Sequence, residues 1–314
     1  MTRPSARPSH KRTILVTGAG GFVCSQVALD LAESGFEVVV TDQVFDDSTL
    51  FRLSGFRRVE APLATALAQL ADLKPFSVVH GATITAGPAE TGLTCAGHVR
   101  ANVDLLTLCL DWARTREATR FVFLSSTGVF AAQDGSDRLT ELTAATGAGP
   151  YAAAKRAGEI ITQGAAEPGF ATLSIRLGNL FGPHEVPRPT RPFVSLLRRM
   201  VREARAGTIR LTNPQARREW TWAPDLGRAL AALLHDFPSA QTPVLHCGNT
   251  EAWTDFALAE AIAGLLPGTR IEVEADPAPT KAPMGSAVRS ALTDFAWTPL
   301  DRALAALLAE RSAA

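Results

Sequence analysis

The sequence predicts an α/β protein with a doubly wound parallel sheet and a smaller C-terminal lobe, and two patterns carry this prediction. Apolar runs rich in β-branched residues recur at 12–18, 36–42, 76–82, 120–126 and 172–179. Helical patterns lie between them, at 25–35, 61–73 and 100–115. Apolar strands that alternate with helices are typical of a parallel sheet covered on both faces, and right-handed crossovers make it doubly wound.

Composition and charge exclude several classes of protein. The 314 residues are 46 % hydrophobic, and 31 basic residues balance 31 acidic ones. Nucleic-acid and membrane-surface partners are not expected, because they need a concentrated basic face. The basic cluster in 198–205 has the spacing of the solvent face of an amphipathic helix. No apolar run approaches the ~18 residues of a membrane span.

The chain start and the cysteines indicate where the protein resides. Residues 1–11 are polar, basic and proline-rich, without the apolar centre of a secretory signal, so we expect a disordered leader. The four cysteines are scattered and form no CxxC pair. Disulfides and a metal site are therefore not expected, and a cytoplasmic location is.

A glycine-rich turn follows the first predicted strand. Gly18, Gly20 and Gly21 precede Phe22 and Val23, where a helix is expected to begin. Such a turn brings backbone N–H groups and a helix N-terminus close to a pyrophosphate. A tight turn between strand and helix would explain the glycines equally well without any ligand, but the context favours a dinucleotide site.

An acidic residue ends the second predicted strand. A carboxylate at Asp42 can accept both hydrogen bonds of an adenosine ribose diol and would repel the 2′-phosphate of NADP. Gln43 and Val44 follow it and offer no arginine for such a phosphate. NAD is therefore the expected cofactor, although Asp42 could instead merely cap a turn.

Cys24 occupies the position where a third glycine is expected. A glycine there lets the helix pack closely on the strand. Because cysteine is small, we expect the helix to shift slightly. Inert packing is the favoured interpretation of the thiol, with redox sensitivity as the alternative.

The single tyrosine of the chain lies four residues before a lysine, in the segment YAAAK from Tyr151 to Lys155. On a helix this spacing places both side chains on one face. A phenol titrates near ~10, and a neighbouring ammonium favours the phenolate. The pair suits removal of a proton from an alcohol, and a serine at the end of the preceding strand, 120–126, could orient the reacting oxygen.

Together these segments resemble the extended short-chain dehydrogenase/reductase family of NAD-dependent sugar epimerases and dehydratases. Seven segments match in order, including VTGAGGFVC, SSTGVF, YAAAK, RLGNLFGP and REWTWAPD. The resemblance implies that Ser126 is the catalytic serine, with Ser125 as the alternative, and that Tyr151 and Lys155 act with it. Other family tyrosines are replaced by phenylalanine here, which leaves the catalytic phenol alone.

The resemblance also assigns the remaining residues and the domains. It implies that His80, Ala82 and Asn102 lie close to the cofactor, and that Thr127, Asn179 and Arg218 contact the substrate. We expect an NAD-binding Rossmann domain at 12–180 plus about 222–249, and a substrate lobe at 181–221 and 250–314. Weaker substrate-binding candidates lie in a proline-rich loop that is equally well explained as solvated: His184, Arg188 and Arg191.

Two departures from the family pattern bear on the substrate. Thr212-Asn213-Pro214-Gln215 replaces the glycine-rich turn of the nucleotide-sugar enzymes, which makes a smaller sugar or sugar acid plausible. Thr127 and Gly128 replace the two acidic residues of the dehydratases, which disfavours 4,6-dehydration.

Three functions remain open from the sequence. The first is an NAD-dependent sugar or sugar-acid dehydrogenase or a sugar epimerase, since both begin with the same oxidation. The others are a nucleotide-sugar 4-epimerase and a non-catalytic NAD-sensing protein. We also expect a homodimer, because the helices at 102–115 and 151–163 carry apolar residues on more than one face and pair across a two-fold axis in relatives.

Overall fold

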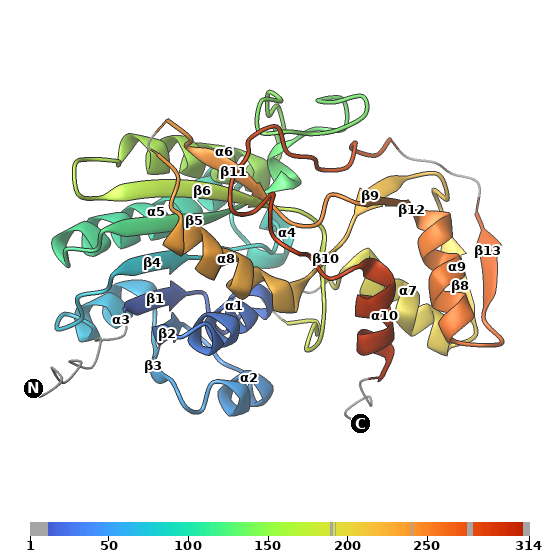
Figure 1. The fold of residues 1–314 in the computed structure, drawn as a ribbon, viewed down its shortest axis with the longest axis horizontal. Helices are drawn as coiled ribbons and strands as arrows, with labels where there is room; N and C mark the ends of the chain where they lie inside the picture. The colour runs from blue at the N-terminus through green and yellow to red at the C-terminus, as the bar shows by residue number, and fades with distance from the viewer. Residues whose placement is uncertain (1–11, 189–190, 192, 240, 275–278, 310–314) are drawn as a thin grey trace, which may run out of the picture.

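The central feature of the fold is a sheet of seven parallel strands in the order β11-β6-β5-β4-β1-β2-β3 (Figure 1). A computed structural model describes residues 12–188, 191, 193–239, 241–274 and 279–309, so the expected leader at 1–11 lies outside the described residues. The strands are β1 (Thr13–Thr17), β2 (Glu37–Asp42), β3 (Arg57–Glu60), β4 (Ser77–His80), β5 (Arg120–Ser126), β6 (Ala171–Leu177) and β11 (Val244–Cys247). The predicted doubly wound parallel sheet is confirmed.

The strand order reverses between β1 and β4, and this reversal determines where a ligand can bind. From β1 the chain winds outward through β2 and β3, then returns to β4 on the other side of β1. Connections leave the carboxyl ends of β1 and β4 in opposite directions, which opens a crevice in sheets of this kind. The glycine turn lies directly after β1, at the edge of this crevice.

Helices cover both faces of the sheet, as the apolar strands require. The helices α1 (Phe22–Glu33) and α8 (Leu226–His235) share one buried cluster with the sheet. On the opposite face, α3 (Leu63–Gln69), α5 (Cys95–Thr115) and α6 (Pro150–Gly164) pack on a second cluster. Short helices occupy two of the connections: α2 (Asp47–Arg52) and α4 (Pro88–Thr91).

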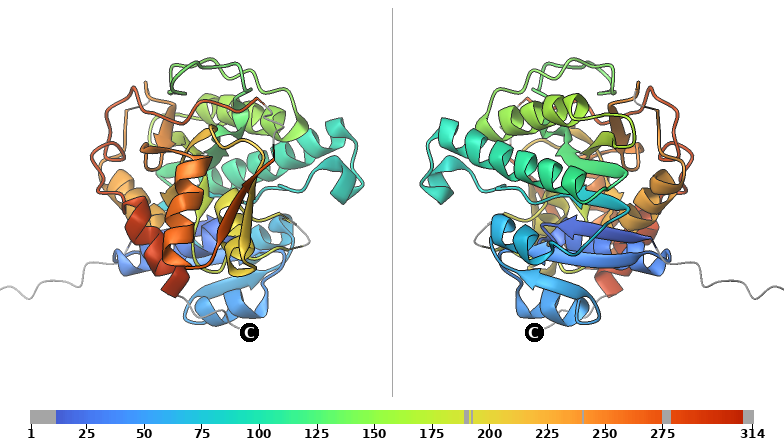
Figure 2. Two further views of the ribbon diagram at one scale, coloured as in Figure 1. Left: turned by 90° about the vertical axis from the view of Figure 1, so that its right-hand side faces the viewer. Right: turned by 90° about the vertical axis from the view of Figure 1, so that its left-hand side faces the viewer.

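A second group of elements lies beside the sheet and has its own buried cluster (Figure 2, left). Its helices are α7 (Leu196–Arg205), α9 (Asp255–Leu265) and α10 (Leu300–Ala309). Its strand pairs are β8 (Thr208–Leu211) with β13 (Arg270–Val273), β9 (Arg217–Glu219) with β12 (Ala252–Thr254), and β7 (Leu180–Phe181) with β10 (Thr221–Trp222). The separate core supports the expected division into two lobes, which stays a prediction.

The basic cluster of the sequence lies on α7, and its arginines are at least partly exposed. Leu197, Met200, Val201 and Ala204 form the buried face of the same helix. The predicted amphipathic helix is therefore confirmed. None of the helices in the described ranges combines the length and apolar character needed to span a membrane.

We expect the substitution Gly158→Ala to destabilise the fold. A Cβ on Gly158, in α6, would lie 2.6 Å from the ring of Phe123 and 3.2 Å from Leu106. Overpacking of a core costs typically 1–3 kcal/mol, which exceeds the roughly 1 kcal/mol by which alanine favours a helix over glycine. Urea unfolding should therefore show a lower unfolding free energy.

Gly164→Ala, at the end of the same helix, is the matched control, because a Cβ there would meet nothing within 4 Å. It should leave stability unchanged or raise it. Equal destabilisation by both substitutions would contradict the packing argument.

Candidate active site

The turn after β1 requires glycine at two positions. Gly18 has φ +76°, and a Cβ on it would lie 2.7 Å from the backbone of Gly81 and Ala82. A Cβ on Gly20 would lie 2.1 Å from the carbonyl oxygen of Val44. Gly21 is the N-cap of α1 and has no side chain to accept from the first helical N–H groups. These N–H groups, including those of the predicted residues Phe22 and Val23, suit an anionic ligand.

Cys24 replaces the expected third glycine, and the residue opposite compensates for it. A Cβ on Gly81, directly after β4, would lie only 2.2 Å from Cys24 Sγ. The sulfur therefore occupies space that the glycine at position 81 leaves free, which is an alternative to the helix shift expected from the sequence. Burial raises the pKa of the Cys24 thiol to about 12, so the thiol stays protonated and packs as an apolar group.

Asp42 lies at the end of β2, beside the glycine turn. Its Oδ2 accepts a hydrogen bond from Gly20 N–H (2.9 Å), and its Oδ1 accepts one from Gln43 N–H (2.7 Å). Burial raises the pKa of this carboxyl, while the hydrogen bonds from Gln43 and Gly20 oppose the shift. Its expected contact with a ribose diol stays a prediction, and the carboxylate already orders the turn.

Two arginines that sequence reasoning treated as weak candidates lie beside the cofactor turn. Arg188 pairs with Asp46 (2.6 Å), and its positive charge also acts on Asp42. The guanidinium of Arg191 lies over the ring of Phe22, 5.4 Å from its centre. The neighbours of Asp42 in sequence contain no arginine, but the fold brings Arg188 close. His184, the third candidate, is exposed, and desolvation lowers its pKa.

His80 is buried beneath the turn. The ring Nδ1 and Thr17 Oγ1 share a hydrogen bond of 2.9 Å, and burial lowers the pKa of His80 to about 3, which keeps it neutral. Thr17 Oγ1 also accepts from Ala82 N–H (3.3 Å). The side chain of His80 is 1 % exposed, so it can influence a cofactor only through the strands that it joins.

Asn102 organises the loop after β4. Its Oδ1 accepts from Ile84 N–H (2.8 Å), and its Nδ2 donates to the carbonyl oxygens of His98 (3.1 Å) and Ile84 (3.4 Å). It lines a small cavity together with Tyr151 and Lys155. The structure thus brings three predicted residues together, and Asn102 positions the backbone around them.

The predicted catalytic residues meet at the carboxyl end of β5. Tyr151 is in the first turn of α6, and its phenol lies close enough to Ser126 for the serine to oppose the rise of the tyrosine pKa. Ser126 Oγ also accepts from Gly128 N–H (2.9 Å). Gly128 is close to the phenol ring, since a Cβ on it would lie 3.0 Å from Tyr151 Cε1. This proximity supports Ser126, the serine favoured from the sequence, as the partner of the tyrosine.

Ser125, the alternative, serves a different purpose. Its hydroxyl donates to Glu159 Oε1 (2.6 Å), and Arg176 binds both carboxylate oxygens of the same Glu159 (2.8 and 2.7 Å). All three residues are buried. Ser125 is therefore held in a structural network below the site, and Ser126 is the serine beside the phenol.

Lys155 lies below the tyrosine and is buried. Its Nζ donates to Thr83 Oγ1 (2.9 Å) and to the carbonyl oxygen of Leu124 (2.7 Å), and is 5.8 Å from the centre of the Tyr151 ring. Burial lowers the pKa of Lys155 to about 8. The pKa of Tyr151 is raised by burial, with Ser126 and Arg191 opposing the shift, which is opposite to the lowering expected from the sequence.

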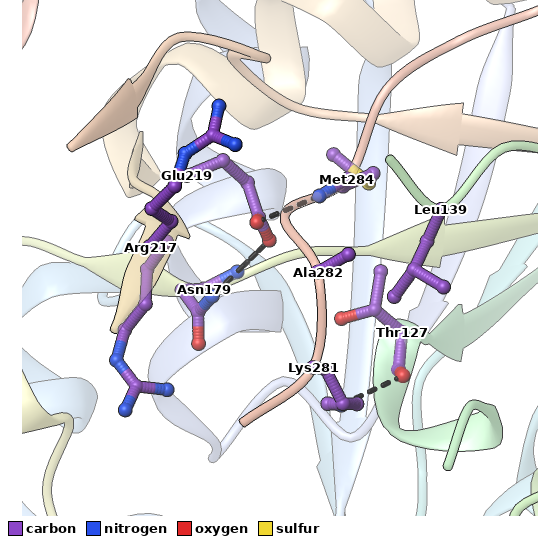
Figure 3. A pocket seen from close by; sticks show the side chains of 9 residues that line it. Thr127, Leu139, Asn179, Arg217, Glu219, Lys281, Ala282 and Met284 are labelled. Atoms are coloured by element: carbon purple, nitrogen blue, oxygen red, sulfur yellow. Dashed lines mark hydrogen bonds between the residues drawn. The ribbon is translucent and has the colours of Figure 1, made fainter. Parts of the chain in front are cut away.

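A second pocket lies between the sheet and the C-terminal lobe (Figure 3). Asn179 donates through Nδ2 to Glu219 Oε1 (3.1 Å), and Met284 N–H donates to Glu219 Oε2 (2.8 Å). Arg218 donates from Nε and Nη2 to the two carboxylate oxygens of Asp255 (2.9 and 3.3 Å). Of the predicted substrate residues, Thr127, Asn179 and Arg218 line this pocket, and Ser126, the fourth, does not.

Sequence reasoning missed several residues of the second pocket, Glu219 and Lys281 among them. Glu219 directly follows Arg218 in a segment already singled out, so its position in the motif was an available signal. Lys281 donates from Nζ to the carbonyl oxygen of Thr127 (2.9 Å), across 154 residues of chain. No local pattern marks this lysine. The described residues contain no group of three or more His, Cys, Asp or Glu arranged to hold a metal ion.

Comparisons with known proteins agree with this architecture. A family model described as the NAD dependent epimerase/dehydratase family matches residues 14–248. A search of curated proteins found no match.

Solved structures with the same fold include three at about one-fifth sequence identity. An epimerase from Methanothermobacter thermautotrophicus is 20 % identical with a TM-score of 0.79, over 95 % of this chain and 91 % of that one. The Helicobacter pylori ADP-L-glycero-D-manno-heptose-6-epimerase is 18 % identical with a TM-score of 0.78, over 95 % of both chains. MoeE5, in complex with UDP-glucose and NAD, is 22 % identical with a TM-score of 0.75, over 94 % and 97 %.

The close approach of Cys24 Sγ to Gly81 predicts that substitutions at these two positions are energetically coupled. We expect Gly81→Ala to lower the unfolding free energy by roughly 1–3 kcal/mol, because its methyl group would overlap Cys24 Sγ. In a Cys24→Ala background the same change should cost much less, since the sulfur is gone. A double-mutant cycle of urea unfolding measures this coupling. An equal cost of Gly81→Ala in both backgrounds would show that the sulfur is not the obstacle.

Proposed function

Because the chain belongs to the NAD-dependent epimerase/dehydratase family, we propose that it is an enzyme that uses NAD to oxidise a secondary alcohol of a sugar-type substrate. The observation that carries the proposal is the position of the Tyr151 phenol beside Ser126, with the Lys155 ammonium 5.8 Å from the centre of its ring. A proton acceptor, an oxygen-orienting hydroxyl and a fixed cation are the groups that this oxidation needs.

The residues around the glycine turn fit NAD. Gly18 and Gly20 let the turn lie tightly against the neighbouring backbone, and the uncapped start of α1 suits a pyrophosphate. Asp42 with Gln43 would hold the adenosine ribose, the backbone at Ala82 would line the nicotinamide side, and Lys155 would hold its ribose. When bound, NAD supplies the acceptor for the hydride.

The chain's own residues handle the proton. Ser126 orients the substrate hydroxyl, and Tyr151 Oη takes its proton as the hydride leaves the carbon, which gives a carbonyl. Burial raises the pKa of Tyr151, so the phenol needs added positive charge nearby to act as a base. Lys155 and the oxidised nicotinamide would provide that charge. In the reverse direction the phenol returns the proton to the carbonyl oxygen.

The oxidised product of the first step has two possible fates. Release of the ketone or lactone would make the protein a dehydrogenase, and reduction of the carbonyl from its other face would make it an epimerase. The second candidate is a nucleotide-sugar 4-epimerase, favoured by the fold shared with a UDP-glucose 4-epimerase from Thermotoga maritima. Against it, Thr212-Asn213-Pro214-Gln215 replaces the glycine-rich turn that the family resemblance implies for nucleotide-sugar enzymes. A small sugar or sugar acid is the preferred substrate.

Three buried, unpaired cysteines are compatible with a reducing cytoplasm.

We expect Tyr151→Phe to abolish most of the activity while NAD binding is retained. Loss of a general base costs typically 10²–10⁴-fold in rate, and the phenyl ring preserves the packing. The assay follows NADH absorbance and sugar products by NMR across free sugars, sugar acids and nucleotide sugars. NADH accumulation indicates a dehydrogenase, and a new stereoisomer without NADH indicates an epimerase. Unchanged biological activity of Tyr151→Phe would instead support a non-catalytic NAD sensor.

We further propose a homodimer that pairs α5 and α6. Ile160, on α6, is 71 % exposed, and Leu108, on α5, is 38 % exposed. A pair of helices that exposes large apolar side chains suits an interface between copies.

A charge at the centre of this surface should break the dimer. Ile160→Glu is expected to give a monomeric mass by light scattering at micromolar concentration. Leu142→Glu, at an 81 % exposed position in the loop before α6, is the control and should leave the mass unchanged. A monomeric wild type would refute the dimer.

A further inference from the structure

Lys281 reaches the candidate active site from the C-terminal segment, which is held firmly in place. Leu139 N–H donates to the carbonyl oxygen of Pro283 (3.0 Å), and Gly285 N–H donates to that of Leu139 (2.8 Å). Met284 N–H donates to the buried Glu219. This backbone pairing places the Lys281 side chain in the pocket beside Thr127 (Figure 3).

The ammonium group of Lys281 lies close to the proposed catalytic residues. Its Nζ lies 2.9 Å from the carbonyl oxygen of Thr127, and Thr127 directly follows Ser126. The ammonium is thus anchored one residue from the serine that contacts the Tyr151 phenol. An anionic group that it bound would lie near the carbon being oxidised, rather than at the far end of a long substrate.

Lys281 differs from the other two cations of this pocket in how its charge is paired. Of the three cations lining it, Arg217 pairs with Asp137 (2.9 Å) and Arg218 with Asp255. Among the described residues, Lys281 forms no ion pair with a carboxylate. The nearest acidic influence is Glu219, whose oxygens already accept from Asn179 and Met284. Burial lowers the pKa of Lys281, while the charges of Glu219 and Asp134 oppose the shift.

We propose that Lys281 is a specificity-determining residue that binds a carboxylate of the substrate, which makes the substrate a sugar acid. The inference rests on the proposed function, because it uses the substrate pocket of that reaction. A lysine ammonium is a compact point charge that suits a single carboxylate. A carboxylate attached to the carbon skeleton also fits the short distance between Lys281 and the reacting end.

Binding measurements test this proposal without relying on turnover. Calorimetry at pH 7, with NADH present, compares glucuronate and galacturonate with glucose, galactose and their 6-phosphates. We expect the wild type to bind a uronate 10- to 100-fold more tightly than its neutral counterpart, the range of a hydrogen bond to a charged group. Lys281→Met should remove this preference while leaving the affinity for neutral sugars within about twofold. Lys281→Arg should retain part of it.

Lys74→Met is the matched control, because Lys74 is an exposed lysine paired with Glu117 on the surface. It should bind the uronates as the wild type does. If Lys281→Met fails to fold, the Lys281→Arg and Lys281→Gln variants decide, since only the latter removes the charge.

The outcomes separate the two proposals. A wild type with no preference for uronates, or a preference that survives Lys281→Met and Lys281→Gln, overturns the carboxylate site. A stronger preference for 6-phosphates that depends on Lys281 overturns the sugar-acid assignment in favour of a phosphorylated sugar. Lys281-dependent uronate binding without any NAD-dependent conversion supports the site and overturns the proposed reaction.

Discussion

The buried ion pair between Arg176 and Glu159 is the interaction on which the candidate site depends. It joins β6 to α6, and Ser125 joins the same carboxylate to β5. Glu159 lies four residues after Lys155 and eight after Tyr151, on the same side of the helix. Because removal of one partner of such a pair leaves an uncompensated buried charge, the helix has one favourable position against these strands. That position brings the phenol to Ser126.

Close backbone approach is the second constraint, and it explains the unusual residue in the cofactor turn. Gly18 and Gly20 are required by neighbouring backbone atoms, whereas position 24 carries a sulfur. The glycine at position 81 supplies the missing space from the opposite strand. The constraint on this turn is therefore the total side-chain volume that fits between β1, α1 and the end of β4. A glycine on α1 or a glycine after β4 can keep that volume small enough.

The two lobes contribute different chemistry to the site. The sheet domain contains Tyr151, the proposed proton-transfer group, and the buried polar residues beneath it. The C-terminal lobe supplies charge: the pocket between the lobes contains Arg217, Arg218 and Lys281 around the buried Glu219. Charges in such a partly enclosed pocket are screened less than on an open surface, so they discriminate between substrates more strongly.

The sequence by itself determined the sheet, the glycine turn and the Tyr151–Lys155 pair, because each depends on local spacing. Apolar runs and helical periods define strands and helices, and an i to i+4 spacing places two side chains on one face. Only the tertiary structure decided which serine meets the phenol, that burial outweighs the nearby charges on Tyr151, and that Arg188 and Lys281 reach the site. These facts depend on contacts between residues far apart in the chain, and on desolvation, which local sequence patterns do not encode.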